Sequence, residues 1–229
     1  MPNEILSYEE MCEREGVIRL QRGMNFGIGG HHSTILMSLR SGAFYKDEVQ
    51  EEGKVLIYEG HDAPRSRPWE NPKLKDQPEY LPTGTLSQNG KFHKAAQDFK
   101  RGLTDVERVR VYEKIKKGIW SYNGVFHLVD SFIVGEDGRM VFKFNLAAVE
   151  DDDFALPPKK VPEFRRIIPT WVKVDVWKRD KGKCVICQSV CHLHFDHIIP
   201  FSKGGSSTTP QNIQILCDKH NLQKHDHII

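Results

Sequence analysis

The sequence predicts an α+β fold in two modules, a mostly β N-terminal domain and a small C-terminal domain organised by a metal ion. Three observations predict it. Apolar runs of strand length recur in the first 150 residues and are separated by Gly, Asn and Asp. A segment with an acidic run and two adjacent prolines follows them. Beyond that segment Cys and His gather, and 6 of the 11 histidines lie in residues 192–229.

Composition and charge exclude several classes of protein. With 38% hydrophobic and 28% charged residues, the chain of 229 residues can bury a core. No apolar run approaches the roughly 18 residues of a membrane span, and the acidic start MPNEILSYEE lacks the basic and apolar regions of a signal peptide. We therefore expect a cytoplasmic protein with no membrane partner. The net charge of +2 divides into +5 for residues 165–229 and −3 for the rest, so the C-terminal part is basic.

The expected domain boundaries follow from the segment EDDDFALPPKKVPEFRR, residues 150–166, whose composition is typical of a linker. We place an N-terminal extension at 1–16 and the β domain at 17–150. The linker follows at 151–169 and the C-terminal domain at 170–229. The chain shows no internal repeats, so each domain is expected to be a single folded unit.

Alternating or continuous apolar runs predict strands in the β domain at 54–60, 107–115, 124–134 and 139–149. Helical spacing that ends at a Gly predicts a helix at 91–102. Between these elements, the segment GHDAPRSRPWENPKLKDQPEYLPTG has five prolines and little periodicity. It is expected to be a long loop, and loops of this length are usually functional or disordered.

The C-terminal domain is expected to begin with a short helix over residues 170–184. Val and Trp recur there at helical spacing, Thr170 is the expected N-cap, and a Gly-containing turn leads to Cys184. The run HLHFDHIIP alternates around Phe195 and predicts a strand that ends near Asp196 and His197. A second strand is expected in PQNIQILC, and a helix from about Cys217 onward.

Two pairs of metal-binding residues frame this domain. Cys184 and Cys187 form one pair, Cys217 and His220 form the other, and two residues separate the members of each pair. At this spacing both side chains of a turn can converge on one ion, and Cys3His is a common structural zinc set. Two matched pairs argue against unrelated buried cysteines. The fourth ligand has alternatives nearby in the sequence, namely Cys191, His192 and His194.

The order of these elements, CxxC, DHIIP, KGG, N, then CxxHN and K, resembles the HNH nuclease family with its ββα-metal core over about residues 170–226. One departure is that the last zinc ligand, usually Cys, is His220, which zinc accepts equally well. The resemblance implies that His197 is the general base. It also implies that Asp196 and Asn221 hold one catalytic Mg²⁺ or Mn²⁺.

In the same family pattern, Asn212 would pin the loop and orient His197, and Lys224 would contact phosphate. The implied chemistry is coherent, because phosphodiester hydrolysis needs a deprotonated water and a cation on the scissile oxygens. Amide and carboxylate oxygens suit Mg²⁺ better than zinc, so two distinct metals are expected. The alternative for Asp196 and His197 is a structural zinc site without chemistry.

The N-terminal half resembles, in order and spacing, the SRA (YDG) domain, a PUA-like twisted β-barrel. The matching stretches are GMNFGIGG, SGAFYKDEV, VLIYEG, SYNGVFHLVDSFI and VFKFNLAAV. The name-giving Tyr-Asp-Gly is replaced here by Tyr122-Asn123-Gly124. Domains of this family bind 5-methylcytosine or 5-hydroxymethylcytosine that is flipped out of DNA, so the resemblance implies modified-cytosine binding.

The residues that would bind the flipped base follow from the same resemblance. Tyr45 and Tyr58 match the two stacking aromatics, and Glu48, or Asp47 if the register slips by one, matches the acidic residue that recognises the Watson–Crick edge. The alternative is that the tyrosines only pack in strands and that YKDE is a solvated turn. Further DNA contacts are expected from Arg65 and Arg67 in the long loop and from Asn25 and Phe26.

Taken together, the sequence predicts a modification-dependent DNA endonuclease that binds double-stranded DNA containing modified cytosine. Because one HNH centre cuts one strand, a double-strand break suggests a homodimer. Three alternatives remain at this point. One is an HNH nuclease without modified-base specificity, and another is a modified-DNA binding protein whose zinc module is inactive. The third is a nuclease of the same kind that recognises a different modified base.

Overall fold

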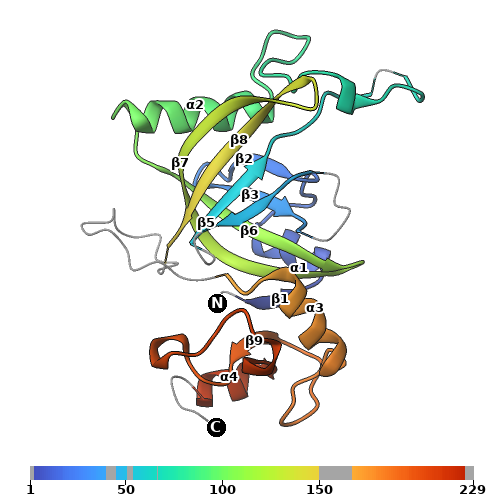
Figure 1. The fold of residues 1–229 in the computed structure, drawn as a ribbon, viewed down its shortest axis with the longest axis vertical. Helices are drawn as coiled ribbons and strands as arrows, with labels where there is room; N and C mark the ends of the chain where they lie inside the picture. Colours follow the sequence, from blue (N-terminus) through green and yellow to red (C-terminus); the bar gives the residue numbers. More distant parts are fainter. Residues whose placement is uncertain (1–2, 40–44, 51–53, 66, 150–166, 225–229) are drawn as a thin grey trace.

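A ten-stranded sheet runs through the part of the chain that the computed structural model describes, residues 3–39, 45–50, 54–65, 67–149 and 167–224 (Figure 1). The predicted linker at 151–169 lies almost entirely outside these residues. The strands are β1 (Glu4–Leu6), β2 (Met24–Ile28), β3 (His32–Met37), β4 (Glu48–Gln50), β5 (Val55–Glu59), β6 (Glu107–Lys116), β7 (Ile119–Glu136), β8 (Arg139–Ala148), β9 (Leu193–His197) and β10 (Ile213–Cys217).

The strand order is β10-β9-β1-β7-β6-β3-β2, while β8 joins β7 to β5 and β5 pairs with β4. All pairs are antiparallel except β3 with β6. The four predicted strands are confirmed as β5 to β8, and the α+β prediction is confirmed with them. Apolar patterns did not predict β1 to β4. Strands β1 and β4 have three residues each, β2 contains a glycine, and β3 shows no alternation that marks its start at His32.

The described helices are α1 (Tyr8–Arg14), α2 (Gln88–Lys100), α3 (Thr170–Arg179) and α4 (Asp218–Lys224). Helix α2 begins before the predicted residue 91, because the Ser87 side chain caps it by accepting a hydrogen bond from the Gly90 amide. Ser7 and Glu10 form a capping box at the start of α1. None of the helices in the described part of the chain is long and apolar enough to cross a membrane.

The segment set aside as an N-terminal extension is a structural bridge. Strand β1 pairs with β7 on one side and with β9 on the other, so Ile5 lies opposite Ser121 and Leu193. The Asn3 amide donates to the Tyr122 carbonyl at 2.6 Å, and the Asn3 carbonyl accepts from the Phe195 amide at 3.0 Å. Figure 1 shows β1 between the N-terminal strands and the C-terminal module. The two modules therefore share one sheet.

A buried polar network joins helix α3 to the same strands. The Lys173 ammonium donates to Glu113 at 2.7 Å and to the Asn123 side-chain oxygen at 2.6 Å, and the side chains of Lys173 and Glu113 are fully buried. The Asn123 amide also donates to Glu113, at 3.0 Å. Thr170, the expected N-cap, is instead the first helical residue after Pro169, because its hydroxyl donates to the Glu113 carboxylate.

Apolar packing closes the same junction. One core cluster contains Ile5 of β1 and Ile115 of β6 together with residues of the C-terminal module. The C-terminal members include Ile168, Val172, Val176, Phe195, Ile213 and Ile215. A separate cluster between α2 and strands β2 to β8 forms the core of the N-terminal module. Because the first cluster spans the junction, separating the modules would expose apolar surface to water.

We predict that Lys173→Met lowers the free energy of unfolding by about 3–5 kcal/mol, because it leaves the Glu113 carboxylate buried without its cation. The double variant Glu113→Leu/Lys173→Met should recover most of the loss, since it removes both charges together. Urea unfolding followed by circular dichroism measures both effects. A single variant as stable as the wild-type protein would show that the pair does not hold the junction.

Candidate functional site

The four predicted metal ligands converge at the C-terminal module. The ligand atoms of Cys184, Cys187, Cys217 and His220 all lie within 4.8 Å of one another. The Sγ atoms of Cys187 and Cys217 are 3.7 Å apart, and His220 Nδ1 lies 3.5 Å from Cys184 Sγ and 3.2 Å from Cys217 Sγ. Around a tetrahedral ion with bonds of about 2.0–2.3 Å, neighbouring ligand atoms are about 3.3–3.8 Å apart. The cluster therefore fits a structural metal.

The chemistry of the cluster also favours metal binding. Burial opposes ionisation of Cys184, but backbone amides of Cys187, Cys217 and Ile186 outweigh it and lower the pKa of Cys184 to about 6. The thiolate, which is the metal-binding form, therefore predominates at neutral pH. Of the alternative ligands, Cys191 is exposed outside the cluster, and His194 Nε2 bonds to the Asp218 carboxylate instead.

His197 ends strand β9 and lies half-buried beside a loop. Its Nε2 atom is 2.9 Å from the Ser207 hydroxyl, which fixes the orientation of the ring. Burial lowers the pKa of His197, and the positive charge of Lys224 adds to this effect while Asp196 opposes it. The ring is therefore held in the neutral form, which can accept a proton.

Asn212 ties the loop that follows His197 to strand β10. Its side-chain oxygen accepts from the Ile199 amide at 2.8 Å, and its Nδ2 donates to the Ile199 and Ser206 carbonyls at 3.1 and 3.0 Å. Gly205 allows this close packing, because a Cβ there would lie 1.8 Å from the Ile199 oxygen. The geometry supports the predicted loop-pinning role of Asn212.

The structure places Lys224 differently from its predicted contact with phosphate. The side chain is 1% exposed, and its ammonium lies 3.1 Å from Asp196 Oδ2 and donates to the His197 carbonyl at 2.6 Å. The ammonium of Lys224 is thus engaged by Asp196 and His197 in this structure, and its contact with phosphate stays a prediction. Asn221 lies half-buried one turn earlier on α4, on the face of the helix that Lys224 shares.

A cavity of about 1100 Å³ opens in the N-terminal module. Tyr45, Asp47, Tyr58, His61 and Asp62 line one part of it. The other part is basic and aromatic, and its lining includes Arg19, Arg22, Lys114 and Trp120. Three of the four predicted base-binding residues, Tyr45, Asp47 and Tyr58, are therefore brought together in one wall.

Asp47 lines the cavity, whereas Glu48 is exposed at the start of β4 and does not. Between the two acidic candidates, the structure thus favours Asp47. Burial raises the pKa of Asp47 to about 7, even though the backbone amides of Glu59 and Ser38 donate to its carboxylate. At neutral pH this carboxyl group can exist in its protonated form, which both donates and accepts hydrogen bonds.

The aromatic residues of the cavity differ in exposure. Tyr45 is half-buried, with the Lys73 ammonium 4.2 Å from its ring centroid and the His61 ring 6.3 Å away. Tyr58 is 1% exposed, so it forms part of the wall but presents little ring surface. Burial lowers the pKa of His61, whose Nε2 accepts a hydrogen bond from the Met24 amide at 2.9 Å.

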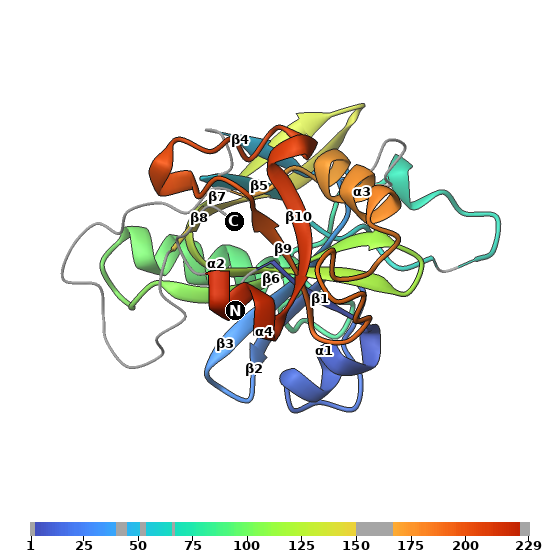
Figure 2. The same ribbon diagram turned by 90° about the horizontal axis from the view of Figure 1, so that it is seen from below.

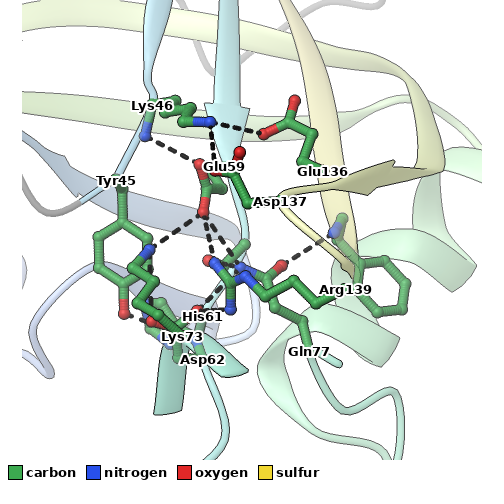
Figure 3. A network of polar contacts seen from close by, with 12 residues as sticks. Tyr45, Lys46, Glu59, His61, Asp62, Lys73, Gln77, Glu136, Asp137 and Arg139 are labelled. Carbon is green, nitrogen blue, oxygen red and sulfur yellow. Dashed lines mark hydrogen bonds and ion pairs between the residues drawn. The ribbon is translucent and has the colours of Figure 1, made fainter. Parts of the chain in front are cut away.

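An ion network around Glu59 supports this wall from behind (Figure 3). The buried Glu59 carboxylate accepts from Lys73, Lys143 and Arg139 at 3.3, 3.3 and 3.1 Å. Burial alone would raise the pKa of Glu59, but the Lys46 amide and these lysines outweigh it and lower the pKa. Arg139 also donates to Asp62 at 2.5 Å. The pocket side chains are thus held before any ligand binds.

The remaining predicted DNA contacts divide into two groups. Arg65 and Arg67 are exposed, and Arg67 lies 5.9 Å from the ring centroid of Trp69, which is 79% exposed.

Asn25 is buried and bonds at both ends of its amide to the Gln21 backbone, at 2.7 and 3.0 Å. Phe26 packs edge-to-face against Phe92 at 5.3 Å. Both side chains therefore make contacts within the fold, and their insertion into DNA stays a prediction.

Sequence reasoning missed three functional candidates. His61 follows strand β5 directly after Gly60, and its place in the pocket depends on a bond to Met24 that is far away in the chain. Ser207 lies in a run of hydroxyl residues in which no single one stands out. Lys73 lies in the proline-rich loop, and nothing in its sequence context indicates that it bonds to Glu59 and lies over the ring of Tyr45.

Residues 184–227 match the family model for HNH endonucleases. This match confirms the HNH resemblance, and the chain carries an HNH endonuclease domain at its C-terminal end. No curated protein sequence matches the chain.

Several solved structures are similar to this chain. The SRA domain of SUVH5 in complex with methylated CHH DNA is 19% identical, with a TM-score of 0.45 over 66% of this chain and 89% of that chain. The SUVH5 SRA domain bound to fully hydroxymethylated CG DNA is 20% identical, with a TM-score of 0.44 over 71% of this chain and 89% of that chain. The DNA modification-dependent restriction endonuclease AspBHI is 14% identical, with a TM-score of 0.44 over 69% of this chain and 79% of that chain.

We predict that the purified protein holds one tightly bound metal ion per chain and that Cys187→Ser loses it on dialysis, because three ligands hold a tetrahedral ion less tightly than four. Cys191→Ser, which changes an exposed cysteine a few residues away, serves as the matched control and should keep the ion. Elemental analysis by mass spectrometry measures the content. Equal loss from both variants would contradict the assigned ligand set.

Proposed function

We propose that this chain is a modification-dependent DNA endonuclease, which binds a flipped modified cytosine in the N-terminal cavity and hydrolyses a nearby phosphodiester bond at the HNH centre. The observation that carries the proposal is the cavity that Asp47 lines together with Tyr45 and Tyr58. Burial there raises the pKa of Asp47 to about 7. The SRA resemblance of the sequence supports the same assignment.

Base recognition would use the neutral form of Asp47. A cytosine presents a ring-nitrogen acceptor next to an exocyclic amine donor. A protonated carboxyl group matches both, since its hydroxyl donates and its carbonyl accepts. Tyr45 would stack on the flipped base, which offsets part of the cost of unpairing it. Methyl and hydroxymethyl groups at C5 leave this edge unchanged, so either mark is compatible with it.

At the HNH centre, neutral His197 would accept the proton of the attacking water. Lys224 bonds to both the Asp196 carboxylate and the His197 carbonyl, and these bonds fix the two residues relative to each other. A Mg²⁺ or Mn²⁺ ion on the oxygens of Asp196 and Asn221 would neutralise charge that develops on the scissile phosphate. We assign zinc to the Cys3His cluster on the basis of its ligand types and spacing.

We further propose that two chains act together as a homodimer when both strands are cut, because one centre hydrolyses one strand at a time. Such an enzyme would act in the cytoplasm, where it meets incoming DNA. Arg65 and Arg67, exposed in the loop after β5, are suited to contact phosphates beside the flipped base.

Digestion of one plasmid prepared unmodified, cytosine-methylated and hydroxymethylated tests the proposal. We expect cleavage of modified DNA in Mg²⁺ or Mn²⁺, and a loss of about 10²–10⁴-fold in rate for His197→Ala, because the general base is removed. His192→Ala changes an exposed histidine of the same module and should cleave normally. Equal cleavage of all three plasmids would contradict the proposal and show a nuclease without base recognition. Binding of modified DNA without cleavage would show a binding protein with no nuclease activity.

Binding of modified cytosine should depend on pH through Asp47. Its pKa in the folded protein is raised to about 7, so the protonated form predominates below pH 7 and is lost above it. We expect the affinity for a duplex with one modified cytosine to fall about tenfold between pH 6 and pH 8, in proportion to the protonated fraction.

Fluorescence anisotropy at constant ionic strength measures this dependence. Asp47→Asn presents the same donor and acceptor permanently, so it should bind with a flat pH profile, whereas Asp47→Leu should bind weakly at every pH. A wild-type profile that stays flat, or a pH slope that persists in Asp47→Asn, would remove Asp47 from base recognition.

A further inference from the structure

We propose that the buried contact between Glu113, Asn123 and Lys173, together with strand β1, fixes the distance along DNA between the recognised base and the cut. The inference rests on the proposed function and adds a positioning role for residues that touch neither the base nor the scissile phosphate. On this view the segment 150–166, which joins the two modules in the sequence, does not set the distance between the recognised base and the cut.

Strand β1 resists sliding of one module against the other. It is hydrogen-bonded to β7 of the N-terminal module and to β9, the strand that carries Asp196 and His197. Side chains alternate along a strand, so a slip of one residue would turn Ile5 out of the shared core. The catalytic strand is thus in a defined register with the N-terminal sheet. Figure 2, seen from below, shows β9 and β10 beside β1.

The polar network resists rotation of α3 on the sheet. Glu113 supplies one negative charge, Lys173 one positive charge, and Asn123 bonds to both without a charge of its own. The network is therefore neutral and fully paired in a buried place. Any rotation that breaks it would leave a charge buried without its partner, which is strongly unfavourable.

The strands that hold the nuclease module also reach the base pocket. Lys114, the residue after Glu113, and Trp120, three residues before Asn123, line the cavity that contains Asp47. The paired strands β6 and β7 therefore connect the two sites.

A rigid connection and a flexible one predict different products. If only a flexible tether of the 17 residues 150–166 joined the modules, its mean span would be about 20–25 Å. At about 3.4 Å per base pair, cuts would spread over roughly six or seven positions. With the junction described above, we expect cleavage at one or two adjacent phosphates on each strand.

The experiment uses the full-length protein and a duplex that carries a single modified cytosine, with cut positions mapped at nucleotide resolution. Insertion of six Gly/Ser residues within 150–166 should leave the positions unchanged. Asn123→Asp adds a second carboxylate to a network with one ammonium, and the cuts should spread over at least four positions. Glu113→Gln/Asn123→Asp restores one carboxylate and one ammonium and should return the narrow pattern.

The possible results separate this inference from the proposed function. If the wild-type protein cleaves only the modified duplex but its cut positions are scattered, the fixed distance is overturned and the proposed function stands. The same holds if the cut positions move in the insertion variant. Cleavage without preference for the modified duplex overturns the function and the inference with it. If Asn123→Asp does not fold, as judged by circular dichroism, the insertion decides alone, since unchanged positions support the inference and moved positions overturn it.

Discussion

The buried ion pair between Lys173 and Glu113 is the contact on which the relation between the two modules depends. A lysine and a glutamate without exposure to water are tolerated only when each satisfies the other, and here Asn123 and Thr170 complete the set. The pair lies close to the shared apolar cluster, because Lys173 follows Val172 and Glu113 pairs with Ser121, the residue opposite Ile5. The shared sheet thus fixes the register of the two modules, and the ion pair and the apolar cluster fix the rotation of α3 on that sheet.

A similar arrangement supports the pocket. The Glu59 carboxylate is buried among Lys73, Lys143 and Arg139, so the strands and loop that carry the pocket residues are fixed without a ligand. Asp47 is buried beside this network, and there burial outweighs both the backbone amides and the charge of Lys143, so that the pKa of Asp47 is raised to about 7. The difference between these two neighbouring acids explains how one is structural and the other is suited to recognition.

Local motifs in the sequence carried most of the C-terminal site. Cys184, Cys187, Cys217 and His220 lie in two short pairs, and their spacing was enough to predict that they converge. Asp196 and His197 are adjacent at the end of β9, where the alternation around Phe195 placed them. The burial of Lys224 against Asp196 could not be predicted, because nothing in the sequence distinguishes a buried lysine from a solvated one. Strand β1 and the pair of Lys173 with Glu113 join segments far apart in the chain, and no periodicity reports such contacts. For the same reason the choice between Asp47 and Glu48 needed the fold.

The central claim is that base recognition in one module directs cleavage by the other. Hydrogen exchange measured by mass spectrometry tests this claim most directly. The protein would be bound to two duplexes that differ only in the C5 group of one cytosine, with Ca²⁺ in place of Mg²⁺ to slow cleavage. The account predicts added protection at residues 45–62 and 193–221 with the modified duplex alone. Equal protection of both segments by both duplexes would contradict it.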